Sequence, residues 1–395
     1  YPLTGMGLMS YEFGIRNMLM QIPLYGDLNQ ELISKAWSKV EESMDVFRSS
    51  ISMNTKENFV RIYDYIPKEL PYIDISGSNL TEKREFMANI IKLMDCYENT
   101  QVYTTNHLAF QVLVVRFGDE EYRLIITCSH LLCDRFSVEI IKARLKEALS
   151  NQDLCFEKIS YADICSLLNN MYTDVTENRI IEKLSLNEYD KGLKNFLQMN
   201  KGRVLRNMRF HYKSESFKLL SDERQYEISQ QAFLKAIKFT YYYTDIPVLL
   251  LHMARKNKHK DLFHHVGEFL DLTPILIRKD YDGMIDTLAK ESLLFKQDQN
   301  LYFASVLMGS ESDRYPEIRQ LFQTYMKDMD KILIVNHTGV IKNGDNLIET
   351  GLDENFTNII DISLFDDGFL MNVPVEDGRQ TEMEKLLTAY LEQGE

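Results

Sequence analysis

Residues 122–137 read YRLIITCSHLLCDRFS, and this stretch determines both the fold class and the chemistry that the sequence suggests. Its first half is an apolar run of strand type that ends at Ser129 and His130. Asp134 follows four residues after the histidine, and a helical pattern begins at Ser137. This strand-to-helix junction therefore predicts a histidine whose backbone is fixed and whose ring can point into a cleft.

His130 is a side chain that can exchange a proton near neutral pH. Asp134 could orient or neutralise it, or could turn inward and pair with an arginine that braces the loop. The sequence shows neither the spacing of a Ser-His-Asp triad nor a G-x-S-x-G elbow. We therefore expect His130 to act on a bound nucleophile. The alternative is a core histidine that is satisfied by a backbone partner.

The bulk composition narrows the class of protein. A chain of 395 residues can bury a sizeable core, and a formal net charge of −14 argues against a nucleic-acid binder. The five cysteines form no CxxC pair, which is typical of a reducing cytoplasm. No apolar run approaches the ~20 residues of a membrane span, and no signal peptide is visible. Because the chain does not begin with methionine, we expect it to be a piece of a larger protein. We expect that protein to be cytoplasmic and this domain to be monomeric.

The pattern of elements predicts an α+β fold with two lobes, 1–165 and 166–395. Apolar spacing after Asn29 predicts a helix with this residue as its N-cap. Further helices are expected at 80–98, 137–151 and 381–393. Strands are expected at 46–53, 59–66, 108–117, 121–130, 269–278, 331–340, 358–365 and 369–375. Residues 161–213 read as a helical and weakly patterned region.

Six short motifs occur in the order and at the approximate spacing of one family. They are YPLTGMG at 1–7, MDVFRSSI at 44–51, CSHLLCDRFS at 128–137, SYADICSLL at 160–168, VGEFLDLTPILIR at 266–278 and VNHTGV at 335–340. In these motifs the sequence resembles the condensation domains of nonribosomal peptide synthetases, members of the chloramphenicol-acetyltransferase-like superfamily. The resemblance covers nearly the whole chain.

The resemblance implies two acetyltransferase-like lobes that form a V with a central tunnel. Upstream and downstream carrier (thiolation) domains, beside an adenylation domain, would each present a thioester on a phosphopantetheine arm. The amine on the acceptor carrier would attack the donor thioester and form an amide. The domain itself would bind no cofactor and no metal.

The resemblance also implies roles for individual residues. His130 matches the second histidine of the family's HHxxxDGxS motif, and would contact the nucleophile as a general base or by positioning it. Asp134 would be structural and paired with an arginine, with Arg48 as the first candidate and Arg278 as the second. The substrate tunnel would include Ser129, Arg135, Ser137, Asn336 and Gly339, with Ser137 also capping the following helix.

Several positions depart from the family pattern, and three of them bear on activity. Ser129 replaces the first histidine, Arg135 replaces a glycine, and Leu167 replaces the tryptophan of the YxDFAxW motif. These departures motivate an alternative, a degenerate and non-catalytic domain that docks a carrier domain or a tailoring enzyme. A free-standing acyltransferase that uses a coenzyme A thioester is a third interpretation, and heterocyclisation and epimerisation rank below amide formation.

Two other patterns could mark sites. The basic cluster at 201–213 is either a solvated face or an anion contact. His264 and Glu268 stand four apart, which would suit a metal on a helix, but Gly267 and the following strand pattern favour a loop with solvent-facing histidines.

Overall fold

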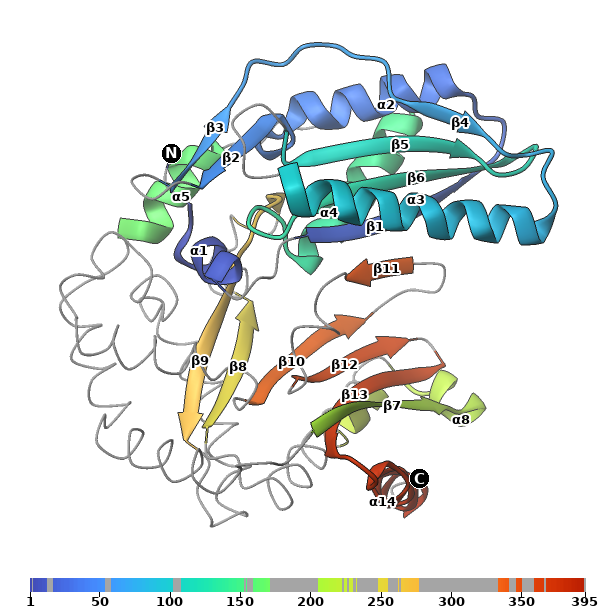
Figure 1. The fold of residues 1–395 in the computed structure, drawn as a ribbon, viewed down its shortest axis with the longest axis vertical. Helices are drawn as coiled ribbons and strands as arrows, with labels where there is room; N and C mark the ends of the chain where they lie inside the picture. Colours follow the sequence, from blue (N-terminus) through green and yellow to red (C-terminus); the bar gives the residue numbers. More distant parts are fainter. Residues whose placement is uncertain are drawn as a thin grey trace. The chain divides into compact units, whose positions relative to one another are not determined.

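The structure is a computed structural model of the whole chain. It describes residues 1, 3–12, 17–53, 58–101, 108–152, 154, 159–170, 205–221, 224–225, 227–229, 232, 248–254, 262, 264–276, 333–340, 346–349, 359–365 and 367–393. Within these ranges, helices and strands are interspersed along the chain and form a mixed α and β fold, as the sequence predicted (Figure 1).

The chain divides into two compact units. The first contains Tyr1–Met171, His259–Phe269 and Gly344–Leu352, and the second contains Tyr172–Lys258, Leu270–Asn343 and Asp353–Glu395. This division differs from the expected contiguous lobes 1–165 and 166–395, because two late segments join the first unit. One of them supplies a sheet strand and the other supplies part of the candidate site.

The first unit is built on a five-stranded sheet. Its strand order is β11 (Asn346–Glu349), β1 (Asn17–Tyr25), β6 (Glu121–Ser129), β5 (Phe110–Arg116) and β4 (Tyr72–Asp74). The hairpin of β5 and β6 confirms the two strands and the turn that the sequence predicted. β1 pairs with β6 from Asn17–Ser129 to Tyr25–Glu121, so the last residue before His130 is held inside the sheet.

Side-chain alternation gives this sheet two apolar faces. Met18 and Met20 of β1 pack in one cluster with Leu124 and Ile126 of β6, together with α2 (Gln30–Ser43) and α4 (Arg135–Leu149). Leu19 and Ile125 belong to a second cluster with α3 (Leu80–Gln101). The period of two along each strand thus buries both faces of the sheet against helices.

Shorter elements complete the first unit: α1 (Gly5–Glu12), η1 (Asp45–Arg48), β2 (Ser49–Met53), β3 (Asn58–Ile62) and α5 (Tyr161–Asn170). Asn29 caps α2, accepting a hydrogen bond from the Leu32 amide at 2.8 Å, which confirms the predicted helix start.

The second unit contains a six-stranded sheet. Its order is β7 (Leu205–Lys213), β13 (Gly368–Glu376), β12 (Ile359–Phe365), β10 (Leu333–Val340), β8 (Val248–Ala254) and β9 (Leu270–Leu276), and α8 (Glu215–Lys218) and α14 (Gln380–Gln393) follow β7 and β13 along the chain. The expected helical character of 161–213 was wrong at its end. Met208 and Phe210 are buried while Arg209 and His211 are exposed, which is the alternation of a strand. This strand, β7, pairs with β13.

No helix among the residues that the structure describes is long and apolar enough to cross a membrane.

A substitution at Gly368 would test how closely β13 packs against β7 in the second sheet. A Cβ placed there would lie 1.9 Å from the Tyr212 carbonyl oxygen of the paired strand β7. We expect Gly368→Ala to destabilise the protein by about 2–4 kcal/mol in denaturant unfolding, because the backbone of β7 or β13 must move. Gly118→Ala is the matched control, since its added Cβ would meet a neighbour at an ordinary 3.5 Å. Equal stability of the two variants would contradict this packing.

Candidate functional site

His130 lies in the turn that joins β6 to α4. β6 ends at Ser129, and the Leu132 amide donates to the Ser129 carbonyl oxygen at 3.0 Å, so the chain turns immediately after the strand. The Ser129 side chain is fully buried, and its Oγ accepts from the Leu131 amide at 3.3 Å. Ser129 therefore shapes the turn that presents His130, whose residue surface is 8 % exposed.

Asp134 caps the helix that follows this turn. Its Oδ1 accepts from the Ser137 amide at 2.8 Å and from the Ser137 hydroxyl at 2.7 Å. Its Oδ2 accepts from the Phe269 amide at 3.2 Å, and its own amide donates to the Gly267 carbonyl oxygen at 3.2 Å. The expected helix cap was Ser137, but Asp134 holds that position and also binds a segment 135 residues later in the chain.

Ser137 strengthens the same connection. Its Oγ accepts from the Gly267 amide at 3.0 Å and lies 3.1 Å from the Gly267 carbonyl oxygen. A hydroxyl has one proton, so it can donate to Asp134 or to this carbonyl at any moment, but not to both. Together, Asp134 and Ser137 fix the backbone of 267–269 against the first turn of α4.

The fixed segment brings Glu268 to His130. The Glu268 Oε2 lies 2.7 Å from the His130 Nδ1, and the side chains are 0 % and 10 % exposed. The contact is a close ionic approach whose angle departs from that of a hydrogen bond. The separation places a buried carboxylate beside one ring nitrogen of the histidine.

Tyr161 and two buried cysteines form the surroundings of this pair. Burial raises the pKa of the Tyr161 phenol well above its usual range, and the nearby Cys165, Glu268 and Cys133 raise it further. Cys133 and Cys165 are free thiols and are fully buried. Because Tyr161 stays neutral, it adds no second anion beside the Glu268 carboxylate.

Arg48 is connected to the site through α5. Its guanidinium pairs with Asp45 at 2.6 Å and donates to the Tyr63 carbonyl oxygen at 2.8 Å, and the other Asp45 oxygen accepts from the Tyr161 amide at 3.3 Å. We expected Arg48 beside Asp134, but Asp45, three residues away on the same short helix, is the partner that its side chain reaches.

Other expected site residues are described less fully or not at all. Arg278 lies outside the described residues, and only the backbone of Arg135 is described, as the first residue of α4. Asn336 and Gly339 lie in β10 of the second unit, a strand of which only the backbone is described. The pairing of β10 with β12 shifts register between His337 and Gly339.

Glu268 is the residue whose role the sequence did not predict. The sequence suggested a loop there with solvent-facing histidines. His264 is exposed as expected, whereas His265 and Glu268 are buried. One feature of the sequence could have revealed the role of Glu268. This carboxylate lies between Gly267 and Phe269, just before a predicted apolar strand, and a buried charge in such a place needs a partner. Within the described ranges, no group of three or more metal-binding side chains occurs.

The arrangement can support proton transfer. With Nδ1 facing Glu268, the ring's other nitrogen, Nε2, is the atom that would meet a substrate. A carboxylate on Nδ1 fixes the ring and stabilises the imidazolium that forms when Nε2 takes a proton. This chemistry would require a nucleophile on the substrate, and that part of the interpretation stays a prediction.

Comparisons with known proteins agree on one type of domain. No protein-family model matches the chain. The cyclosporin synthetase simA of Tolypocladium inflatum is 26% identical over 125 residues, which cover 31% of this chain and 1% of the synthetase. The matched region is thus a small piece of a much longer curated relative.

Solved structures match almost the whole chain. The starter condensation domain of rhizomide synthetase, in complex with C8-CoA and Leu-SNAC, has a TM-score of 0.66 and 11% identity, covering 99% of this chain and 94% of that one. An X-domain from teicoplanin biosynthesis, in complex with OxyB, has a TM-score of 0.61 and 12% identity, covering 99% and 92%. This chain therefore shares the fold of these condensation and X-domains.

Proposed function

We propose that the chain is a condensation-type acyltransferase that forms an amide between two carrier-bound substrates in a cytoplasmic peptide synthetase. The observation that carries this proposal is His130, presented by a strand-to-helix turn and held 2.7 Å from the buried Glu268 carboxylate. The condensation-like fold supports the substrate class. Carrier domains would deliver both substrates on phosphopantetheine arms, beside an adenylation domain.

In the proposed reaction, the acceptor amine nitrogen attacks the carbonyl carbon of the donor thioester. The new C–N bond forms, the C–S bond breaks, and the sulfur leaves as a thiolate on the donor arm. Nε2 of His130 accepts the proton that the amine loses, and returning that proton to the thiolate regenerates both the free thiol and the neutral imidazole. Glu268 stabilises the positive charge on the ring between these two steps.

A second candidate is a non-catalytic docking domain. The X-domain in complex with OxyB favours it, because a similar fold there is bound to another protein. The departures at Ser129 and Arg135 from the family pattern favour it too. Under this alternative, the chain binds a carrier domain or a tailoring enzyme and transfers nothing.

Removing the imidazole separates these two functions. We expect His130→Ala to lower transfer by about 100-fold or more, because proton transfer loses its acceptor. The measurement is intact-mass spectrometry of the two neighbouring carrier domains, loaded with candidate groups. Circular dichroism would verify that the variant folds. If the parent transfers and His130→Ala transfers equally well, the proposed role of His130 is contradicted. Carrier binding without any transfer would support the docking domain.

Removing the charge of Glu268 tests its role separately. The variant Glu268→Gln keeps the shape and an acceptor oxygen, so we expect the ring to stay in place while kcat falls by about 100-fold or more and KM changes little. Glu268→Asp should recover part of the loss, since it restores the charge. A rise in KM with an unchanged kcat would contradict a role in the reaction.

Asp134 should affect stability through its two connections. Asp134→Asn can keep the bond from the Ser137 amide, but its amide group cannot also accept from Phe269. We expect a loss of about 1–3 kcal/mol in the free energy of unfolding. The control is Asp163→Asn, an exposed residue that also bonds near a helix start, to Ser160. An equally small loss at both positions would contradict the tethering role of Asp134.

A further inference from the structure

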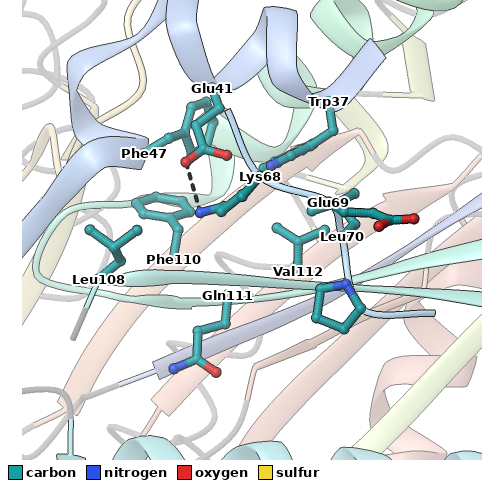
Figure 2. Close-up of a pocket in the computed structure, with 11 residues that line it drawn as sticks. Trp37, Glu41, Phe47, Lys68, Glu69, Leu70, Leu108, Phe110, Gln111 and Val112 are labelled. Atoms are coloured by element: carbon teal, nitrogen blue, oxygen red, sulfur yellow. Dashed lines mark ion pairs between the residues drawn. The ribbon is translucent and has the colours of Figure 1, made fainter. Parts of the chain in front are cut away.

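The first unit contains a cavity of about 370 Å³ in addition to the site around His130. It lies between α2, η1, the segment 68–71 and the start of β5 (Figure 2). Cavities of roughly 300–1,000 Å³ are the usual size for small-molecule sites. Three aromatic residues and one buried carboxylate line it, and none of them takes part in the proposed transfer reaction.

The aromatic wall of the cavity is built into the core. The Trp37 and Phe47 rings meet edge to face with centroids 5.2 Å apart, and the Phe47 and Phe110 rings do so at 4.7 Å. All three residues are buried, and they come from α2, η1 and β5. Because these rings hold each other in place, the wall is formed before any ligand binds.

Glu41 supplies the charge of the cavity. It stands one helical turn after Trp37 on α2, and its side chain is 6 % exposed. Its Oε1 lies 2.8 Å from the Lys68 Nζ, and Figure 2 shows the two side chains pointing toward one another. A carboxylate this buried requires a cation, so the cavity has a defined place for an ammonium group.

Lys68 fills that place from a part of the chain that can release it. Its side chain is 45 % exposed and belongs to 63–71, a segment without helix or strand, in which residues 67–69 are exposed. An exposed ammonium can return to water at little cost, whereas the Glu41 carboxylate stays behind in the cavity. Lys68 is therefore the group that an incoming cation would have to displace.

We propose that this cavity is a binding site for a small primary amine with an aromatic or aliphatic body. The ligand ammonium replaces that of Lys68 at the Glu41 carboxylate, and its apolar body packs against Trp37, Phe47 and Phe110. This site is separate from the chemistry at His130 and does not depend on the proposed transfer reaction.

The single tryptophan of the chain makes the proposal directly measurable. Trp37 lines the cavity, so intrinsic tryptophan fluorescence reports on this site. We would titrate the full chain with 2-phenylethylamine, which is protonated at pH 7, and with 2-phenylethanol, its neutral counterpart. We expect saturable binding of the amine and at least about tenfold weaker binding of the alcohol, because the charged contact is lost.

Variants at the two charged residues should act in opposite directions. Lys68→Ala removes the competing cation, so we expect it to bind the amine about threefold to tenfold more tightly. Glu41→Gln should weaken amine binding at least about tenfold. Glu69→Gln is the matched control, since Glu69 is an exposed carboxylate that also lines the cavity, and it should leave the affinity unchanged.

Equal affinity for the amine and the alcohol would overturn the proposal, as would an affinity that Lys68→Ala leaves unchanged or weakens. The Lys68→Ala result keeps the test decisive even if Glu41→Gln fails to fold, because it is a gain of binding at an exposed residue. No transfer assay enters these measurements, so failure of the proposed acyltransferase function would not alter their outcome.

Discussion

The hydrogen bonds of the Asp134 carboxylate are the constraint on which the candidate site depends. One oxygen completes the first turn of α4, and the other holds the Phe269 amide of a segment 135 residues away. Glu268 lies in that segment, directly before Phe269, so its position relative to His130 follows from this backbone connection. An aspartate that caps a helix gains its hydrogen bonds with little loss of side-chain freedom, and it therefore serves as a firm anchor. The family pattern suggested a structural role for Asp134, and these bonds give that role a physical form.

The buried His130–Glu268 pair is costly to keep, and its surroundings explain how it persists. Taking a carboxylate out of water costs several kcal/mol in real proteins unless a cation and further hydrogen-bonding groups offset the loss. His130 supplies the compensating charge when its ring is protonated. The phenol beside the pair has a raised pKa, so Tyr161 stays neutral and the local charge is limited to Glu268 and His130. Such an arrangement is typical of a site where a proton changes position, since a purely structural contact would be more stable with apolar side chains.

The sequence predicted most of the local structure of the first unit and less of what lies far apart in the chain. The cap of α2 at Asn29, the hairpin of β5 and β6, and the junction at His130 follow from patterns within about 20 residues. The long-range partners of these elements do not follow from such local patterns. Glu268 reaches His130, and β11 joins the first sheet, from segments that lie in the C-terminal half of the chain. Periodicity contains no information on such pairings, so the division at residue 165 and the pairing of Asp134 with Arg48 differ from the observed structure.

Ser129 stands where the family pattern has its first histidine. The Ser129 side chain is fully buried and accepts a hydrogen bond from the Leu131 amide inside the turn. A histidine at this position would have to place a larger polar ring in the same buried space. The carboxylate that faces His130 comes instead from Glu268 on the other segment. A serine at position 129 thus belongs to the packing of the turn, while the contact between His130 and Glu268 does not involve it. Under the proposed transfer reaction, the departure at Ser129 therefore weighs less against catalysis than the motif comparison suggests, and the charge of Glu268 weighs more.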